Sequence, residues 1–332
     1  MFHLLIIFFA LLLAELFYFR IADRFNIIDK PNERSSHTQI TIRGGGIIFP
    51  IAWVMYSVLE GFAFPYVSIG MLLMATISFI DDRIELSSKI RLLIHLLSFT
   101  LCFVEIGIFA FLPWYAVLAI YIVCIGAVNA INFMDGINGI TALYGLSIII
   151  PLHLYFYGIT FVLSPFSILA ISLLVFGIFN FRKRARCFAG DVGSVSLGYI
   201  LLFFLLLLIF NQLSIQEDRL VIASEYKGMD IRYLFLLMLY GIDSIFTIVQ
   251  RLYQKENIFK AHRKHLYQLL VNEYRVPHLW VASSYALIQL AINYAILFLP
   301  LSVSATLLVA ILLSLLYILL KVALLQKIMK TG

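Results

Sequence analysis

The segment SVSLGYILLFFLLLLIFN, residues 194–211, contains no charged side chain along its whole length. A helix needs about 20 mostly apolar residues to cross the hydrocarbon core of a bilayer. This segment is therefore predicted to be a membrane-spanning helix, and it decides the class of the fold. The motif FAGDVGS, residues 188–194, leads directly into it, so a polar turn with two glycines lies at one membrane surface.

The rest of the chain follows the same pattern. Of its 332 residues, 63% are hydrophobic and 13% are charged, whereas soluble domains carry about 25% charged residues. A soluble globular fold is therefore excluded, and the apolar first segment is expected to be a retained span rather than a signal peptide. We expect an all-α, polytopic integral membrane protein that forms a single domain over residues 1–332. Its expected transmembrane helices, eleven in all, are 1–19, 44–63, 66–80, 92–111, 113–129, 138–158, 162–181, 194–211, 231–250, 278–298 and 300–326.

The basic residues predict the orientation of these helices. With eleven spans, 21 of the 24 Lys and Arg residues fall on one face, and only Arg219, Lys227 and Arg232 fall on the other. Basic residues close to the spans are retained in the cytoplasm. The N-terminus is therefore predicted to lie outside and the C-terminus in the cytoplasm. The predicted cytoplasmic loops lie near residues 20–43, 81–91, 129–139, 182–193 and 251–277.

The same topology gathers four acids, Asp81, Asp82, Asp135 and Asp191, at the cytoplasmic surface. The adjacent carboxylates of FIDDR (79–83) repel each other and favour a divalent or neighbouring cation. Glycines and amides in NAINFMDGINGI (129–140) suit close approach to a polar ligand. An acid at a helix start in FAGDVGS is typical of an anion and Mg²⁺ site.

Two basic loops accompany the acids. AHRKH (261–265) combines two histidines with two cations, which can bind phosphates, and DKPNERSSHTQITIRGGG (29–46) ends in a glycine triplet. Each motif also has an ordinary structural interpretation, such as a solvated acid pair, a tight turn, an N-capping Asp, a flexible hinge or a positively charged loop. Their presence together on one face favours a functional site.

In chain order the five motifs are DKPNERSSH with RGGG, FIDDR, NAINFMDGING, FAGDVGS and HRKH. In that order they resemble the motifs of the polyprenyl-phosphate N-acetylhexosamine-1-phosphate transferases, of the glycosyltransferase family 4 type. The resemblance runs from about Asp29 to His265 and fits an eleven-helix topology. RSSH (34–37), LSSK (86–89) and HRKHLYQ (262–268) are most similar to the bacterial branch that initiates O-antigen, lipopolysaccharide or other surface and cell-envelope glycans. Ile40 and Ile42 depart from the family pattern, where many relatives have proline, and Asn138 departs where some have aspartate.

The resemblance implies a reaction at the cytoplasmic face of the bacterial inner membrane. Undecaprenyl phosphate would attack the sugar-bearing phosphorus of a UDP-N-acetylhexosamine, giving undecaprenyl-diphosphate-N-acetylhexosamine and UMP. The implied cofactor is Mg²⁺, with Mn²⁺ as the alternative ion. The implied partners are the two substrates and the bilayer, with no nucleic acid. The identity of the sugar, the glycan pathway and the oligomeric state, including a homodimer, stay open.

The resemblance also implies roles for individual residues. Asp191, with Asn132 and Asp135, would hold the metal, and Phe188 and Asn138 would contact uracil. His262 and Arg263 would grip the diphosphate, while Asp81, Asp82 and Lys89 would face the lipid phosphate. The implied catalytic residues are Asp81, Asp82, Asp135 and His262. The implied substrate contacts are Asn132, Asn138, Phe188, Lys89, Arg263, His265, Arg34, His37 and Arg43.

The role of the aspartate pair can be weighed on chemical grounds. A phosphate monoester has a second pKa of about 6, so most lipid phosphate is already a dianion at neutral pH. A general base would add little, and we expect Asp81 and Asp82 to act mainly through a metal or through positioning. Proton abstraction and a covalent aspartyl-phosphate are the weaker options.

Two other classes of membrane protein predict different patterns of polar residues. A secondary transporter or flippase places its functional acids near the bilayer midplane, often within an internal repeat. No repeat is visible, and the acids inside predicted spans, Glu15, Glu105 and Asp243, are few and scattered. A scaffold protein predicts no gathering of acids, amides and histidines on one face.

Overall fold

Helix α9 (Gly190–Ile209) is the centre of the structure, a computed structural model that describes residues 2–29, 40–84, 86–160, 162–223, 226, 228–257 and 262–331. Its sequence is apolar on all sides, as expected of a helix without a solvent face, and every residue from Val192 to Ile209 is buried. Helices α2 (Ile48–Leu59), α3 (Pro65–Asp81) and α6 (Trp114–Met134) pack around it.

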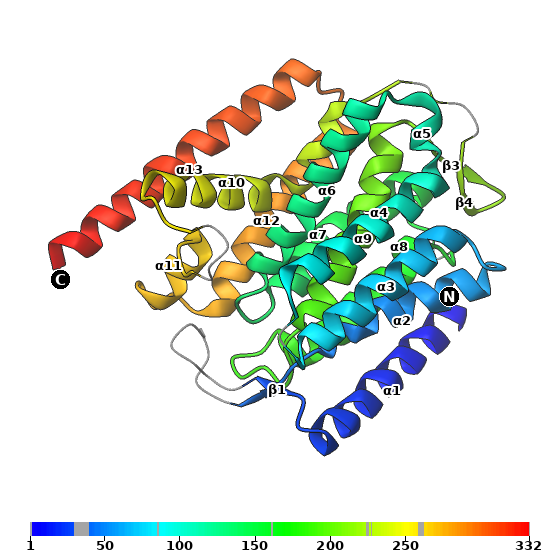
Figure 1. Ribbon diagram of the computed structural model, residues 1–332, viewed down its shortest axis with the longest axis horizontal. Coiled ribbons are helices and arrows are strands. Elements are labelled where there is room, and N and C mark those ends of the chain that lie inside the picture. The colour runs from blue at the N-terminus through cyan, green and yellow to red at the C-terminus, as the bar shows by residue number, and fades with distance from the viewer. Residues whose placement is uncertain are drawn as a thin grey trace.

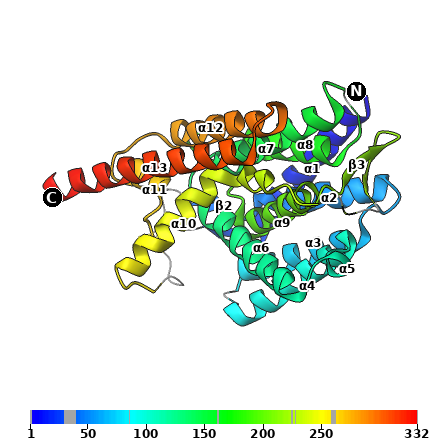
Figure 2. The ribbon, with the colours of Figure 1, turned by 90° about the horizontal axis from the view of Figure 1, so that it is seen from above.

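The described residues form thirteen α-helices and two short 3₁₀ helices. Figure 1 shows most of the helices as a bundle, with the C-terminal helix projecting beyond it, as Figure 2 also shows. The remaining helices are α1 (Phe2–Arg24), α4 (Ser88–Ile106), α5 (Ile108–Phe111), α7 (Ile140–Tyr157), α8 (Pro165–Asn180), α10 (Met238–Tyr253), α11 (Leu266–Asn272), α12 (His278–Phe298), α13 (Val303–Thr331), η1 (Gly45–Ile47) and η2 (Ile231–Leu237).

The helices confirm a multi-pass, all-α membrane protein for the described part of the chain. Seven helical stretches, one of them η2 and α10 taken together, are long and apolar enough to cross a membrane, and three shorter apolar helices cover 45–59, 65–81 and 165–180. Each of the eleven predicted segments overlaps a helix. Pro65 and Pro113 lie at helix starts, where proline is tolerated because the first N–H groups have no partner within the helix.

The bundle has two unlike ends. Strands β1 (Ile28–Asp29) and β2 (Thr41–Ile42) pair at one end, near the start of α9, while β3 (Leu213–Gln216) and β4 (Arg219–Ile222) form a hairpin at the other. In Figure 1 the N-terminus lies toward the β3–β4 end and the C-terminus toward the opposite end. The β3–β4 hairpin and the short helix α11 were not predicted, since each is too short for a clear periodic pattern.

The predicted span 231–250 is divided in the structure into η2 (Ile231–Leu237) and α10 (Met238–Tyr253). A break within an apolar span is tolerated only when the freed backbone groups find partners inside the protein. Gln289 on α12 supplies them, donating through Nε2 to the carbonyls of Phe235 and Leu236 over 3.3 and 3.0 Å. The break lets α10 run across the direction of α6 (Figure 1).

The glycine triplet is held against the segment that precedes α9. The amides of Gly45 and Gly46 donate to the carbonyls of Phe188 and Ala189 over 2.8 and 3.0 Å, and the Phe188 amide donates to the Ile42 carbonyl over 2.8 Å. We call these paired segments, 42–46 and 186–189, the loop ladder. It brings the RGGG segment (43–46) against the start of the FAGDVGS motif.

Small residues are needed beside this ladder. A Cβ atom on Gly46 would lie 2.3 Å from Gly193 Cα and 2.8 Å from the Ala189 carbonyl oxygen. Both are backbone atoms, so neither can move aside cheaply. The close approach explains why glycine, rather than any larger residue, serves here.

We predict that Gly46→Ala lowers the free energy of unfolding by about 1–3 kcal/mol, the usual cost of overpacking. Thermal unfolding of the detergent-solubilised protein measures the change. Gly126→Ala in α6 is the matched control, because a Cβ there meets open space. Equal melting temperatures for the two variants would contradict the close contact.

Candidate active site

The side chain of Asp82 accepts hydrogen bonds from the N-terminus of α9. Its two carboxylate oxygens accept from the backbone amides of Asp191 and Val192 over 3.1 and 3.2 Å. The first amides of a helix lack partners within the helix and carry a partial positive charge. Asp82, the C-terminal cap of α3, therefore joins the end of one helix to the start of another.

Arg43 lies between two carboxylates of this cluster. Its Nε atom is 2.7 Å from Asp82 Oδ1 and its Nη2 atom 3.6 Å from Asp191 Oδ1, while Tyr18 donates to its backbone carbonyl over 2.6 Å. Burial lowers the pKa of Arg43, but Asp82 and Asp191 more than offset this and raise it. Burial also raises the pKa of Asp82, and Arg43 works against that rise. Arg43 therefore allows two acids to lie close together.

Asp81 has a different set of partners from Asp82. Its Oδ1 accepts the Leu86 amide over 2.8 Å and its Oδ2 lies 2.9 Å from Arg91 Nη1. Lys89 is exposed near the start of α4. Arg91, rather than Lys89, thus pairs with this acid in the structure.

The NAINFMDGINGI and FAGDVGS motifs meet at the start of α9. Ser194, in the first turns of α9, donates from its hydroxyl to Asn132 Oδ1 over 2.6 Å. Thr141 donates its hydroxyl to Asp135 Oδ1. Burial raises the pKa of Asp135 to about 6, the Thr141 hydrogen bond opposes the rise, and the nearby charge of Asp82 adds to it. Asp135 is therefore within electrostatic reach of the Asp82 cluster.

Amide side chains fasten the loops that carry Asn138 and Phe188. Asn138 is buried, and its Nδ2 atom donates to the Arg182 carbonyl over 2.8 Å. Asn180 accepts the Gly139 amide over 2.7 Å and donates to the Cys187 carbonyl over 2.8 Å. Phe188, next along the chain, is half-buried. One buried asparagine at the end of α8 thus positions both loops.

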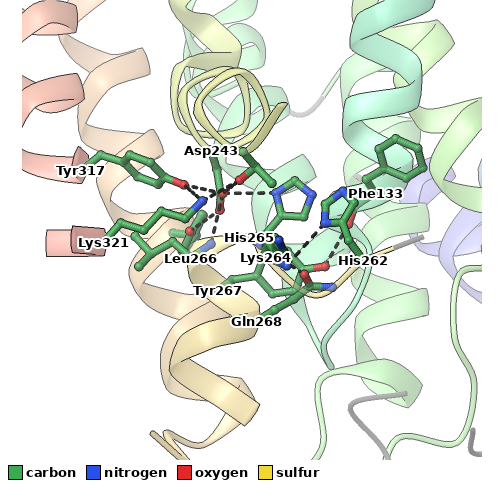
Figure 3. Close-up of polar contacts among 12 residues, drawn as sticks. Phe133, Asp243, His262, Lys264, His265, Leu266, Tyr267, Gln268, Tyr317 and Lys321 are labelled. Carbon is green, nitrogen blue, oxygen red and sulfur yellow. Dashed lines mark hydrogen bonds and ion pairs between the residues drawn. The ribbon is translucent and has the colours of Figure 1, made fainter. Parts of the chain in front are cut away.

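The HRKH motif lies against the C-terminal end of α6 (Figure 3), which continues to Met134, so the loop predicted near 129–139 begins only after it. The hydroxyl of Tyr267 donates to the Phe133 carbonyl over 2.9 Å. The rings of His262 and His265 have centroids 4.9 Å apart. Burial is the largest cause that lowers the pKa of His262, to about 4. His262 is therefore a neutral imidazole at pH 7, while Arg263 beside it is half-buried.

The donor set can be compared with the needs of Mg²⁺. In the part of the chain that the structure describes, no three His, Cys, Asp or Glu side chains form a preassembled metal site. Mg²⁺ seldom needs one, because it keeps several waters and binds through one or two carboxylates plus substrate phosphates. Asp191, Asp135 and the amide oxygen of Asn132 suit that kind of binding.

Several residues of the site differ from the expectation or fall outside it. Helix α9 begins at Gly190 rather than near Ser194, so Asp191 lies in its first turn and not in the preceding loop. Arg34 and His37 lie outside the described residues. Four partners were missed, and the sequence signal for them was weak, since single polar residues near helix ends are common: Arg91, Thr141, Asn180 and Ser194.

Comparison with known proteins gives two matches. The model of glycosyl transferase family 4 matches residues 64–209, a range that holds the carboxylate motifs from Asp81 to Asp191. A Bacillus subtilis (strain 168) protein described as a probable undecaprenyl-phosphate N-acetylglucosaminyl 1-phosphate transferase is 27% identical over 271 residues, which cover 76% of this chain and 72% of that protein. The matches agree with the order and the gathering of the motifs, and residues 64–209 of the chain are similar to glycosyl transferase family 4.

Proposed function

We propose that the protein transfers N-acetylhexosamine-1-phosphate from a UDP-sugar to undecaprenyl phosphate, giving undecaprenyl-diphosphate-N-acetylhexosamine and UMP. The observation that carries the proposal is the meeting of Arg43, Asp82 and Asp191 at the N-terminus of α9. Such a site combines a cation, carboxylates for a metal and a positive helix end, all of which suit phosphates. The name of the Bacillus relative makes N-acetylglucosamine the first sugar to test.

The reaction joins two anions, so the protein must screen their charges. An oxygen of the lipid phosphate attacks the sugar-bearing phosphorus, and the bond from that phosphorus to UMP breaks with its electron pair leaving on UMP. Asp191, Asn132 and Asp135 would hold Mg²⁺, which supplies charge neutralisation to the diphosphate. Arg43 would add a fixed positive charge beside it, and Arg34 and His37 are proposed further contacts.

The remaining roles are assigned by position. Asp82 is occupied by two amides and Arg43, which supports a positioning role over a role as base or nucleophile. Asp81, with Lys89 nearby in sequence, would face the lipid phosphate. His262, Arg263 and His265 would bind the diphosphate.

The uracil contacts are proposed for the loops that Asn180 fastens. The Asn138 amide nitrogen already donates to a backbone carbonyl, so its oxygen is the atom available to the base. Phe188 is half-buried and would stack on it.

We propose that all eleven predicted segments cross the membrane, with the N-terminus outside, the site in the cytoplasm and residues 1–332 forming one domain. The 21 to 3 division of basic residues supports this orientation. The position of the two termini toward opposite ends of the bundle agrees with an odd number of crossings (Figure 1).

Transfer of labelled sugar phosphate from a panel of UDP-N-acetylhexosamines to undecaprenyl phosphate tests the activity. We expect lipid product and UMP that require Mg²⁺ or Mn²⁺ and are lost in Asp191→Asn. Asp218→Asn, an exposed acid in the β3–β4 hairpin, is the matched control and should keep full activity. Absence of product with every donor, from folded protein, would refute the transferase.

Labelling of single cysteines with a membrane-impermeant maleimide tests the orientation. We expect Glu217→Cys to react in intact cells and Lys255→Cys to react only after permeabilisation. Both positions are exposed, whereas the native cysteines are buried, so the parent protein gives a low background. The reverse pattern would invert the proposed topology.

The pH dependence of transfer tests the role of Asp135. Thr141→Val removes the hydrogen bond that lowers the pKa of this carboxyl, so the pKa rises above its value of about 6. The carboxylate form, which binds cations, then forms only at higher pH. We expect the acidic limb of the pH-rate profile to move to higher pH in Thr141→Val, but not in Thr100→Val on α4. An acidic limb that does not move in Thr141→Val would contradict a role for the Asp135 carboxylate in the reaction.

A further inference from the structure

Asp243 on α10 is a fully buried carboxylate surrounded by donors from several helices (Figure 3). Its Oδ2 atom accepts the Tyr285 hydroxyl over 2.8 Å. Its Oδ1 atom lies 2.9 Å from the Tyr317 hydroxyl and 3.1 Å from the Leu266 amide. An acid inside a membrane span is costly and usually marks function. Asp243 connects α10, α11, α12 and α13 at one point.

The same carboxylate also holds His265. The Nδ1 atom of His265 lies 3.2 Å from Asp243 Oδ1. A carboxylate can only accept, so Nδ1 carries the hydrogen of this bond. The Nε2 atom is buried and has no hydrogen-bond partner among the described residues. Figure 3 shows His262 on the side of the His265 ring opposite Asp243.

Lys321 on α13 contacts the hydroxyl groups that donate to the Asp243 carboxylate. Lys321 Nζ donates to the Thr247 hydroxyl over 2.8 Å and to the Tyr317 hydroxyl over 2.9 Å. Both hydroxyls in turn donate to Asp243 Oδ1. A buried carboxylate needs such compensation to stay ionised. Helix α13, most of which is not buried, thereby reaches the HRKH motif through Lys321 and Tyr317.

We propose that Asp243 is a positioning residue of the transfer site. Through the bond to Nδ1–H it fixes the ring orientation of His265, so that a hydrogen on Nε2 can be donated to a diphosphate oxygen, and through the Leu266 amide it anchors the start of α11 beside His262. Outer partners of this kind set which nitrogen of a histidine faces its ligand. The inference rests on the proposed function and deepens it.

A double-mutant cycle separates positioning through His265 from a general effect on folding. We expect Asp243→Asn to lower kcat/KM for the UDP-sugar about 10- to 100-fold, as loss of an outer partner does, with the KM for undecaprenyl phosphate unchanged. In a His265→Gln background the same substitution should cause no further loss. Multiplied losses in the double variant, or an unchanged Asp243→Asn enzyme, would overturn the inference.

Glu105→Gln is the matched control for removing a carboxylate from a span. Glu105 accepts the amides of Tyr66 and Val67 over 2.7 and 3.2 Å, at the start of α3 and far from the HRKH motif in the sequence. The small loss of kcat/KM in Glu105→Gln should multiply with the loss in His265→Gln when the two substitutions are combined.

Two further measurements keep the outcome decisive. If Asp243→Asn does not fold, Tyr285→Phe removes one donor to the same carboxylate, and its few-fold loss should also vanish in the His265→Gln background. Nitrogen NMR of labelled histidine should show a hydrogen-bonded Nδ1–H for His265 in the wild type and a change of this signal in Asp243→Asn. An inactive wild type would refute the proposed function, whereas an active wild type with multiplied losses would refute this inference alone.

Discussion

The N-terminus of α9 lies near one end of the bundle, where Gly190 and Asp191 are half-buried and the first amides need acceptors from the protein. Asp82 supplies their acceptors, and its burial is possible because Arg43 lies 2.7 Å away. Removing Arg43 leaves a buried charge on Asp82, and removing Asp82 leaves the first amides of α9 unpaired, and either loss is costly. The position of α3, the segment that carries Arg43 and the start of α9 relative to one another therefore depends on this contact.

The other motifs are attached to this centre by side chains with no charge of their own. Ser194 fastens Asn132, Asn180 fastens two loops and Tyr267 fastens the HRKH motif to Phe133. These neutral hydrogen bonds fix the positions of the motifs without adding charge. The net charge at the site is therefore set by its acids and by the cations that a diphosphate would contact. Asp243 is the exception, and it is balanced by Lys321 on a separate helix through hydroxyl groups.

Much of this architecture could be read from the sequence because long apolar runs have one physical solution in a bilayer. The gathering of Asp82, Asp191 and Arg43 also followed from alternation of the spans. Pairings were harder to predict, because Lys89 and Arg91 are equally plausible partners for Asp81 until the direction of α4 is known. Asp243 was set aside as an isolated acid, since its partners on α11, α12 and α13 are distant in the sequence.

The loop ladder joins residues 42–46 to residues 186–189, so its two sides emerge from the ribosome far apart in time. Chains fold from the N-terminal part first during synthesis. The glycine triplet must therefore wait, without its partner, until the segment before α9 has been made and that helix has entered the bilayer. A nascent chain that stops short of α9 would carry Arg43 and Asp82 without a ladder to hold them, so the site is assembled as a late step of biogenesis.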